Sequence, residues 1–283
     1  MSALTGFKEA PVMSKRWLLL ALLPFCVATA LAAKDKSAPD PTADPLMITA
    51  GFLTHHPDMK YRLLGMKAYD QKNYEDALRF FRRASFFADK PSQGMVAEML
   101  WKGEGAPRDP ALAYAWMDLA AERGYAGFMG LRERYWNALD ASERQRALTE
   151  GEAIYARFGD AAAKPRYETQ LRRGRTQITG SRTGFAGNVQ IIIPGPSGEQ
   201  SIDGSKFYDE RYWDAKKYWA YTDQMWAKPR IGRVEVGGVE QVDASGQPKL
   251  ESRVRQTAPE VDAVEPDVPE EPAPLPGVVP SNE

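Results

Sequence analysis

The chain has 283 residues, which is enough for one or two domains with a buried core. Hydrophobic residues make up 43% of it and charged residues 27%, so neither wholesale disorder nor a polytopic membrane protein is favoured. The 37 basic and 38 acidic residues give a formal net charge of −1, which argues against a nucleic-acid partner held by overall charge. A single cysteine excludes an intramolecular disulfide.

The amino-terminal residues have the three-part pattern of a secretory signal peptide. A basic pair at 15–16 precedes an apolar run over 17–27, and small residues follow. This run is shorter than the roughly 20 residues that cross a bilayer. We therefore expect residues 1–33, with Met13 as an alternative start, to be removed on export to a bacterial periplasm. That leaves no membrane span in the mature chain; secretion and an uncleaved anchor in the inner membrane are the alternatives.

Two segments are predicted to lie outside any folded domain. Residues 34–57 are interpreted as a linker, because they begin with polar and proline residues without apolar spacing. Residues 257–283 contain seven prolines, seven acidic residues and no basic residue. Such a composition buries too little apolar surface to offset the entropy of ordering, so we expect a disordered acidic tail.

Between these segments, small and aromatic residues recur at three- and four-residue steps. Gly65 and Ala68 fall on one helix, a polar break follows at 71–73, and Ala77 and Phe81 begin the stripe of a second helix. Two amphipathic helices joined by a short polar turn predict an αα-hairpin.

A second hairpin is predicted 35–36 residues after the first. Gly103 and Gly105 permit a tight reversal, because glycine takes positive φ angles without a steric cost. Asp109 is placed to cap the next helix, which carries the stripe Ala113 and Trp116. A helix pair repeated at this period indicates an α-solenoid.

This second unit resembles a Sel-one-like repeat, a branch of the tetratricopeptide superfamily. The matching positions are Ala97, Leu100, Trp101, Gly103, Gly105, Asp109, Ala113, Trp116, Ala120, Ala121 and Gly124. The resemblance covers residues 58–125 and implies a short right-handed α-α superhelix. It also implies an adaptor or scaffold whose concave face binds a protein or peptide. The matching residues specify helix stacking, and none of them identifies a partner.

The repeats are expected to continue to residue 175. A third, degenerate helix pair is predicted over 126–158, with Asp140 and Glu143 as a capping box, and a closing helix over 165–175. The fold class is therefore mainly α over residues 58–175.

A small α+β region is predicted over residues 176–256. Two β-branched runs, at 188–193 and 230–236, flank a helical pattern over 214–227. We expect these elements to pack on the last helix of the repeats. A glycine-rich stretch at 180–187 is interpreted as a hinge.

Eight aromatic residues fall within 207–226. Trp219 and Trp226 share a helical face and predict a core stripe. The alternative is an exposed platform that stacks on peptidoglycan sugars or clamps a peptide. The solvent exposure of Trp213 and Tyr221 decides between the two.

Two further clusters are candidate sites. A basic patch, which includes Arg166, is interpreted as a solvated helix face, with phosphate, the acidic tail or an acidic partner as alternative contacts. His55 and His56 lack a third ligand at metal spacing and are interpreted as a loop pair. The candidate partner-binding residues are Trp213, Trp219, Tyr221, Trp226, Arg172 and Arg173.

The sequence contains no nucleophile–base pair, metal cluster or cofactor loop, so we expect neither enzymatic activity nor a cofactor. Carboxylates beside the aromatic segment leave an envelope hydrolase as a remote alternative. The predicted function is non-catalytic binding of a protein or peptide partner, with glycan binding through residues 207–226 as the second interpretation.

The pattern makes Trp116 a test of the predicted core. We expect Trp116→Ala to lower the free energy of unfolding by about 3–5 kcal/mol, because it removes a large buried side chain and leaves a cavity. Urea denaturation followed by circular dichroism measures this loss. A loss below about 1 kcal/mol, the range of surface substitutions, would contradict the burial of the indole.

Overall fold

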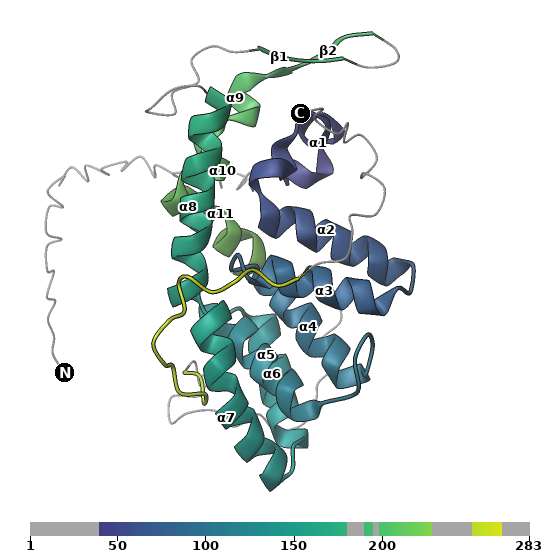
Figure 1. The fold of residues 1–283 in the computed structure, drawn as a ribbon, viewed down its shortest axis with the longest axis vertical. Helices are drawn as coiled ribbons and strands as arrows, with labels where there is room; N and C mark the ends of the chain where they lie inside the picture. The colour runs from purple at the N-terminus through teal and green to yellow at the C-terminus, as the bar shows by residue number, and fades with distance from the viewer. Residues whose placement is uncertain (1–39, 180–189, 195–197, 228–250, 268–283) are drawn as a thin grey trace, which may run out of the picture. The chain divides into compact units, whose positions relative to one another are not determined.

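A computed structural model describes residues 40–179, 190–194, 198–227 and 251–267. These residues are mainly helical and include one two-stranded sheet (Figure 1). The predicted signal peptide, the glycine-rich hinge, the strand at 230–236 and the last part of the predicted tail lie outside the described residues. Within the described part of the chain, no helix combines the length and apolar character needed to cross a membrane.

Residues 40–57 are folded, so the prediction of a linker is wrong for this stretch. Its elements are η1 (Pro41–Ala43), α1 (Pro45–Thr49) and η2 (Phe52–His55). Asp40 and Asp44 cap the first two of these elements by accepting hydrogen bonds from backbone amides. Met47 and Phe52 are buried in the core. The polar and proline residues therefore cap and begin short helices that deliver apolar side chains inward.

The predicted repeat region forms a series of antiparallel helices and turns. These are α2 (Pro57–Asp70), α3 (Tyr74–Ser85), α4 (Lys90–Lys102), α5 (Pro110–Ala120), η3 (Ala121–Arg123), α6 (Ala126–Ala138), α7 (Ala141–Phe158) and α8 (Asp160–Thr179). Helix α2 packs on α3, α3 on α4, and α4 on α5; helix α5 contacts both α6 and α7, and α7 contacts α8. Each hairpin thus contacts the next along the chain.

The reversal between α4 and α5 places two glycines where no other residue fits as well. Gly103 and Gly105 have φ angles of 78° and 77°. A Cβ atom on Gly105 would lie 2.3 Å from the carbonyl oxygen of Tyr74, so this glycine lets the α4–α5 loop contact the start of α3. Asp109 caps α5 by accepting a hydrogen bond from the amide of Leu112 at 3.0 Å.

Small and aromatic residues of the matching unit are in the core. Trp116 is 1% exposed, and its ring centroid lies 4.8 Å from that of Phe158 on α7. Its burial is as predicted. The buried alanines of α5 and η3 are Ala111, Ala113, Ala115, Ala120 and Ala121, and Gly124 follows with a φ of 71°.

The third helix pair is also present. Asp140 caps α7, and Glu143 accepts a hydrogen bond from the Asp140 amide at 3.0 Å, which completes the predicted capping box. The closing helix α8 begins at Asp160, earlier than predicted. The Asp160 amide donates to the carboxylate of Glu122 at 3.0 and 3.2 Å, which satisfies the helix start before Pro165 is reached.

The region after α8 contains a β-hairpin and three helices. Strand β1 (Gln190–Ile193) lies within the predicted run at 188–193. It pairs antiparallel with β2 (Gln200–Asp203), a strand that was not predicted. Helices α9 (Gly204–Phe207), α10 (Glu210–Trp213) and α11 (Ala215–Ala227) follow. Helix α11 agrees with the predicted helical pattern over 214–227.

The described residues of this region do not form a core of their own. Buried side chains of residues 190–227 belong to the same core as those of η2, α2 and α8. Residues 251–267 have no regular secondary structure, but they lie against α3, α7 and α8 (Figure 1). The first part of the predicted tail, residues 257–267, is therefore not disordered in the structure.

Replacement of Gly105 tests the contact between the first two hairpins. We expect Gly105→Ala to lower the free energy of unfolding by about 2 kcal/mol or more, because alanine is strained at positive φ and its Cβ would clash with the Tyr74 carbonyl oxygen. Gly127→Ala, in α6, is the matched control, since an added Cβ there meets no atom within 4 Å. Urea denaturation of both variants should leave Gly127→Ala at least as stable as the parent protein.

Candidate functional site

The aromatic segment forms part of the core. Trp213 and Tyr221, whose exposure was to decide its role, are 3% and 5% exposed. The buried face of α11 carries Tyr218 and Tyr221, whereas Trp219 and Trp226 are half-buried at its edge. The buried face of α11 is therefore rotated from the predicted stripe of Trp219 and Trp226 toward Tyr218 and Tyr221. It follows that Trp213 and Tyr221 do not form an exposed platform.

The aromatic residues cover a buried polar cluster that joins α2, α8 and α11. The Nδ1 atom of His56 lies 2.9 Å from the hydroxyl of Tyr167, and the Tyr218 hydroxyl donates to the Asp58 carboxylate. The His56 ring stacks on Phe52 with a centroid separation of 4.0 Å. His56 lies between η2 and α2, where a loop residue was predicted, but its side chain is buried in the core.

Burial determines the charge states in this cluster. It raises the pKa of Asp58 to about 6, with the nearby Asp89 carboxylate adding to the effect. Burial also lowers the pKa of His56 to about 3. The Nε2 atom of His56 and one carboxylate oxygen of Asp58 have no hydrogen-bond partner among the described residues. The cluster connects three helices through hydrogen bonds. Its unpaired buried polar atoms lower the stability of the folded protein.

The remaining predicted candidates are separated from one another. Trp219 donates from its indole nitrogen to Glu168 at 2.9 Å, and Trp226 lies 5.7 Å from the Arg62 guanidinium. Arg172 and Arg173 are exposed on α8. The structure therefore does not gather these residues into one site.

The carboxylates beside the aromatic segment are used in caps and ion pairs. Asp209 caps α10 and pairs with Arg211, and Glu210 pairs with Lys217. Asp214 accepts from an amide at the start of α11, and Asp223 from the Tyr125 hydroxyl. No group of three His, Cys, Asp or Glu side chains able to hold a metal occurs in the described ranges.

A different site is formed where residues 251–267, here called the strap, cross the helical face. Ser252 donates to the buried carboxylate of Asp118 on α5, which also accepts from the Tyr155 hydroxyl at 3.0 Å. Val254 is 3% exposed and packs at Gly151, where an added Cβ would lie 2.8 Å from the valine. The strap thus inserts an apolar side chain between helices.

Arg253 is the best-bound side chain of the strap. Its guanidinium donates to both carboxylate oxygens of Glu133 at 2.8 and 2.6 Å, and it lies 4.9 Å from the centroid of Trp136. Burial acts to raise the pKa of Glu133, but the hydrogen bonds from Arg253 and Arg132 outweigh it and lower that pKa. Such bidentate pairs are among the stronger polar contacts in proteins.

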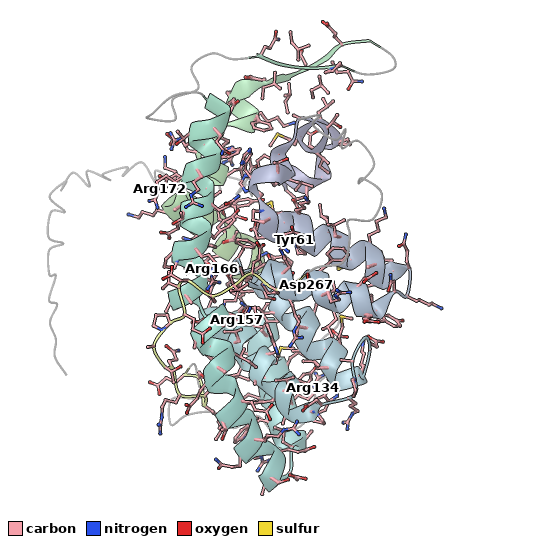
Figure 2. All side chains as sticks on the ribbon, in the orientation of Figure 1. Tyr61, Arg134, Arg157, Arg166, Arg172 and Asp267 are labelled. Atoms are coloured by element: carbon pink, nitrogen blue, oxygen red, sulfur yellow. The ribbon has the colours of Figure 1, made fainter. Side chains whose placement is uncertain are left out.

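The second half of the strap is held through its backbone at α7 and α8. The Glu260 amide donates to the carbonyl oxygen of Ala156 at 2.6 Å. Arg166 donates to the Glu260 carbonyl and to the Phe86 carbonyl, each at 2.7 Å. Arg157 donates to the carbonyl of Val264. Figure 2 shows Arg157 and Arg166 where the strap crosses these helices.

Acidic side chains of the strap meet arginines on α3. Glu265 accepts a hydrogen bond from Arg83 at 2.5 Å, and Asp267 lies 3.6 Å from Arg79. The sequence predicts the acidic tail as one alternative contact of the basic patch that contains Arg166. This prediction missed the α3 arginines and the anchor at Ser252–Val254. The opposite charges of α3 and the tail were the one feature of the sequence that could have indicated this contact.

No model of a known protein family, no curated protein and no solved structure matches the chain.

The buried cluster predicts opposing effects of pH on stability. The raised pKa of Asp58 stabilises the folded protein at low pH, and this contribution is lost as pH rises from about 4 to 6. The lowered pKa of His56 has the opposite sign, so its contribution to stability grows with pH over about 3 to 6.

Replacing Asp58 should therefore leave the pH dependence of stability that His56 contributes. We expect Asp58→Asn to gain about 3 kcal/mol of unfolding free energy relative to the parent protein as pH rises from about 4 to 6. Urea denaturation at a series of pH values gives both curves. Parallel curves for the two proteins would show that Asp58 does not titrate in this range.

Proposed function

We propose that the protein is an exported, non-catalytic helical-repeat adaptor that binds an extended peptide on the face now covered by the strap. The observation that carries this proposal is the way the protein holds its own residues 251–267. They lie across α3, α7 and α8 without secondary structure and are bound through both backbone and side chains. A face that binds an extended segment of its own chain has the chemistry to bind one from a partner.

The contacts define what a partner peptide would need. A basic residue would pair with Glu133 and stack on Trp136, and a small apolar residue after it would fill the position at Gly151. Acidic residues further along would meet the arginines of α3. At protein interfaces a few anchor side chains in pockets usually carry most of the binding energy, and a polar periphery surrounds them.

The family resemblance supports the same proposal. Sel-one-like and tetratricopeptide repeats imply a right-handed solenoid with a binding face formed by successive helix pairs. The consecutive contacts of the helices from α2 to α8 are compatible with that arrangement. Export, on which the resemblance is silent, is proposed from the amino-terminal sequence alone.

A covalently attached strap competes strongly with any free peptide. A tethered segment has an effective concentration of about the millimolar range, so a partner must displace it or be offered in excess. An experiment on the folded protein should therefore free the strap after folding. A specific protease site introduced within residues 228–250 allows the chain to be cut once it has folded.

After cleavage, a fluorescent peptide with the sequence of residues 251–267 should exchange into the site, measured by fluorescence anisotropy. We expect saturable binding to the cut protein and at least 10-fold weaker apparent binding to the uncut protein. A labelled peptide carrying Arg253→Ala should bind the cut protein about 10-fold more weakly, because it loses the bidentate pair.

A peptide carrying Arg255→Ala is the matched control, since the Arg255 side chain is 82% exposed and its nearest carboxylate lies 3.9 Å away. Equal affinities for the Arg253→Ala and Arg255→Ala peptides would contradict the proposed anchor. Failure of the parent peptide to exchange into the cut protein would contradict the proposed function.

A further inference from the structure

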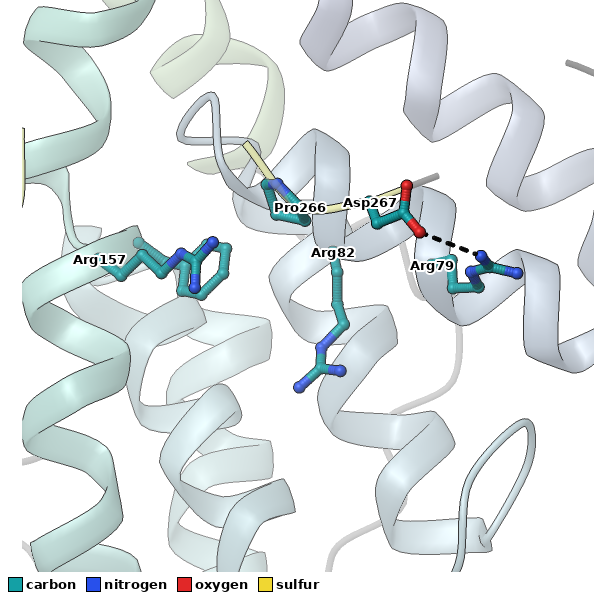
Figure 3. Close-up of a pocket in the computed structure, with 6 residues that line it drawn as sticks. Arg79, Arg82, Arg157, Pro266 and Asp267 are labelled. Atoms are coloured by element: carbon teal, nitrogen blue, oxygen red, sulfur yellow. Dashed lines mark ion pairs between the residues drawn. The ribbon is translucent and has the colours of Figure 1, made fainter. Parts of the chain in front are cut away.

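A cavity of about 330 Å³ lies between α3, α7 and the end of the strap. Its lining combines three arginines, Arg79 and Arg82 of α3 and Arg157 of α7, with Phe158 and with Pro266 and Asp267 of the strap (Figure 3). This volume falls at the lower end of the range of small-molecule sites.

Positive charge in the cavity exceeds negative charge. Among the described residues of the lining, Asp267 is the one acidic residue; it is 94% exposed and lies 3.6 Å from Arg79. Within the described ranges, no carboxylate lies within 4.0 Å of Arg82 or Arg157. Arg79 also lies 3.7 Å from Asp76, so Arg82 and Arg157 are the two arginines of the lining without a nearby carboxylate among the described residues.

The arginines are also incompletely satisfied. The Nε atom of Arg157 is buried without a hydrogen-bond partner in the described part of the chain. Although Arg82 reaches solvent, the surrounding protein desolvates its guanidinium, and this effect together with the charge of Arg157 lowers the pKa of Arg82. Since arginine keeps its proton at neutral pH, loss of a proton does not relieve this repulsion, whereas a bound anion would.

We propose that this cavity is a binding site for a phosphomonoester, a dianionic phosphate group carried on a small apolar body. The two positive charges of Arg82 and Arg157 match the charge of about −1.5 to −2 that such a group has at pH 7. Guanidinium groups suit phosphate oxygens because their donors form a planar fork. Phe158 and Pro266 supply an apolar surface for the attached body.

The volume distinguishes this ligand from inorganic phosphate. A cavity of about 330 Å³ is much larger than one phosphate ion, for which no apolar wall would be needed. This inference concerns the protein with the strap in place, and its site shares no residue with the anchor formed by Ser252–Val254 with Glu133 and Gly151. Phosphate binding to the uncut protein and peptide exchange into the cut protein are therefore measured separately, and each proposal can fail without the other.

Isothermal titration calorimetry of the full chain tests the site with three probes: phenyl phosphate, inorganic phosphate and benzoate. We expect phenyl phosphate to bind at least 10-fold more tightly than either of the others, because it alone combines the dianion with an apolar ring. Benzoate binding as tightly as phenyl phosphate would overturn the dianion preference. Equal binding of inorganic phosphate would overturn the role of the apolar wall.

Variants locate the binding. We expect Arg82→Gln to weaken phenyl phosphate binding at least 10-fold, and Arg82→Lys, which keeps the charge but not the fork, to weaken it less. Arg172→Gln, on the exposed face of α8, is the control and should bind as the parent protein does. Unchanged affinity in Arg82→Gln, or no saturable binding to the parent protein, would overturn the proposal. Circular dichroism confirms that each variant is folded.

Discussion

Close approach between helix backbones at small residues is the constraint on which this structure depends. Gly105 brings the α4–α5 loop against the backbone of Tyr74, and buried alanines in α5 let neighbouring helices approach. Large side chains such as Trp116 fill the space that remains between the hairpins. Protein interiors tolerate little change in volume. These contacts therefore fix the orientations of the helices and, with them, the shape of the face that carries the strap. Gly151 extends the same principle to that face, because its missing side chain accommodates Val254.

Charge is arranged on the strap-bearing face in two different ways. Near its start, Arg253 of the strap pairs with Glu133 of the helical body, both largely removed from water. Further along the signs are reversed, and arginines of α3, α7 and α8 hold acidic side chains and backbone carbonyls of the strap. This largely buried bidentate pair should dominate the affinity of the strap for the helices, since exposed ion pairs contribute little. The excess of arginine over carboxylate near Asp267 then leaves positive charge for another ligand.

Features that depend on a few neighbouring residues were predictable. The capping box at Asp140 and Glu143 and the glycine turn at Gly103 and Gly105 need no distant partner, so the sequence pattern alone indicates them. The orientation of α11 was not predictable in the same way. Its aromatic residues are spread around the helix, and only docking against His56 and Tyr167 selects Tyr218 for the core. The peptide-like anchor around Arg253 was likewise hidden, because its partners on α5, α6 and α7 lie more than a hundred residues away in the chain.

The sequence by itself determined the helical character of the body, the helix caps and tight turns, and the burial of Trp116, because periodicity and local hydrogen bonding act within a few residues. Only the tertiary structure decided that residues 40–57 are folded and that residues 257–267 lie against the helices. Their composition is polar and proline-rich, and their ordering comes from contacts with partners far along the chain. Such contacts have no local signature, since they exist only once the helices that supply them have packed together.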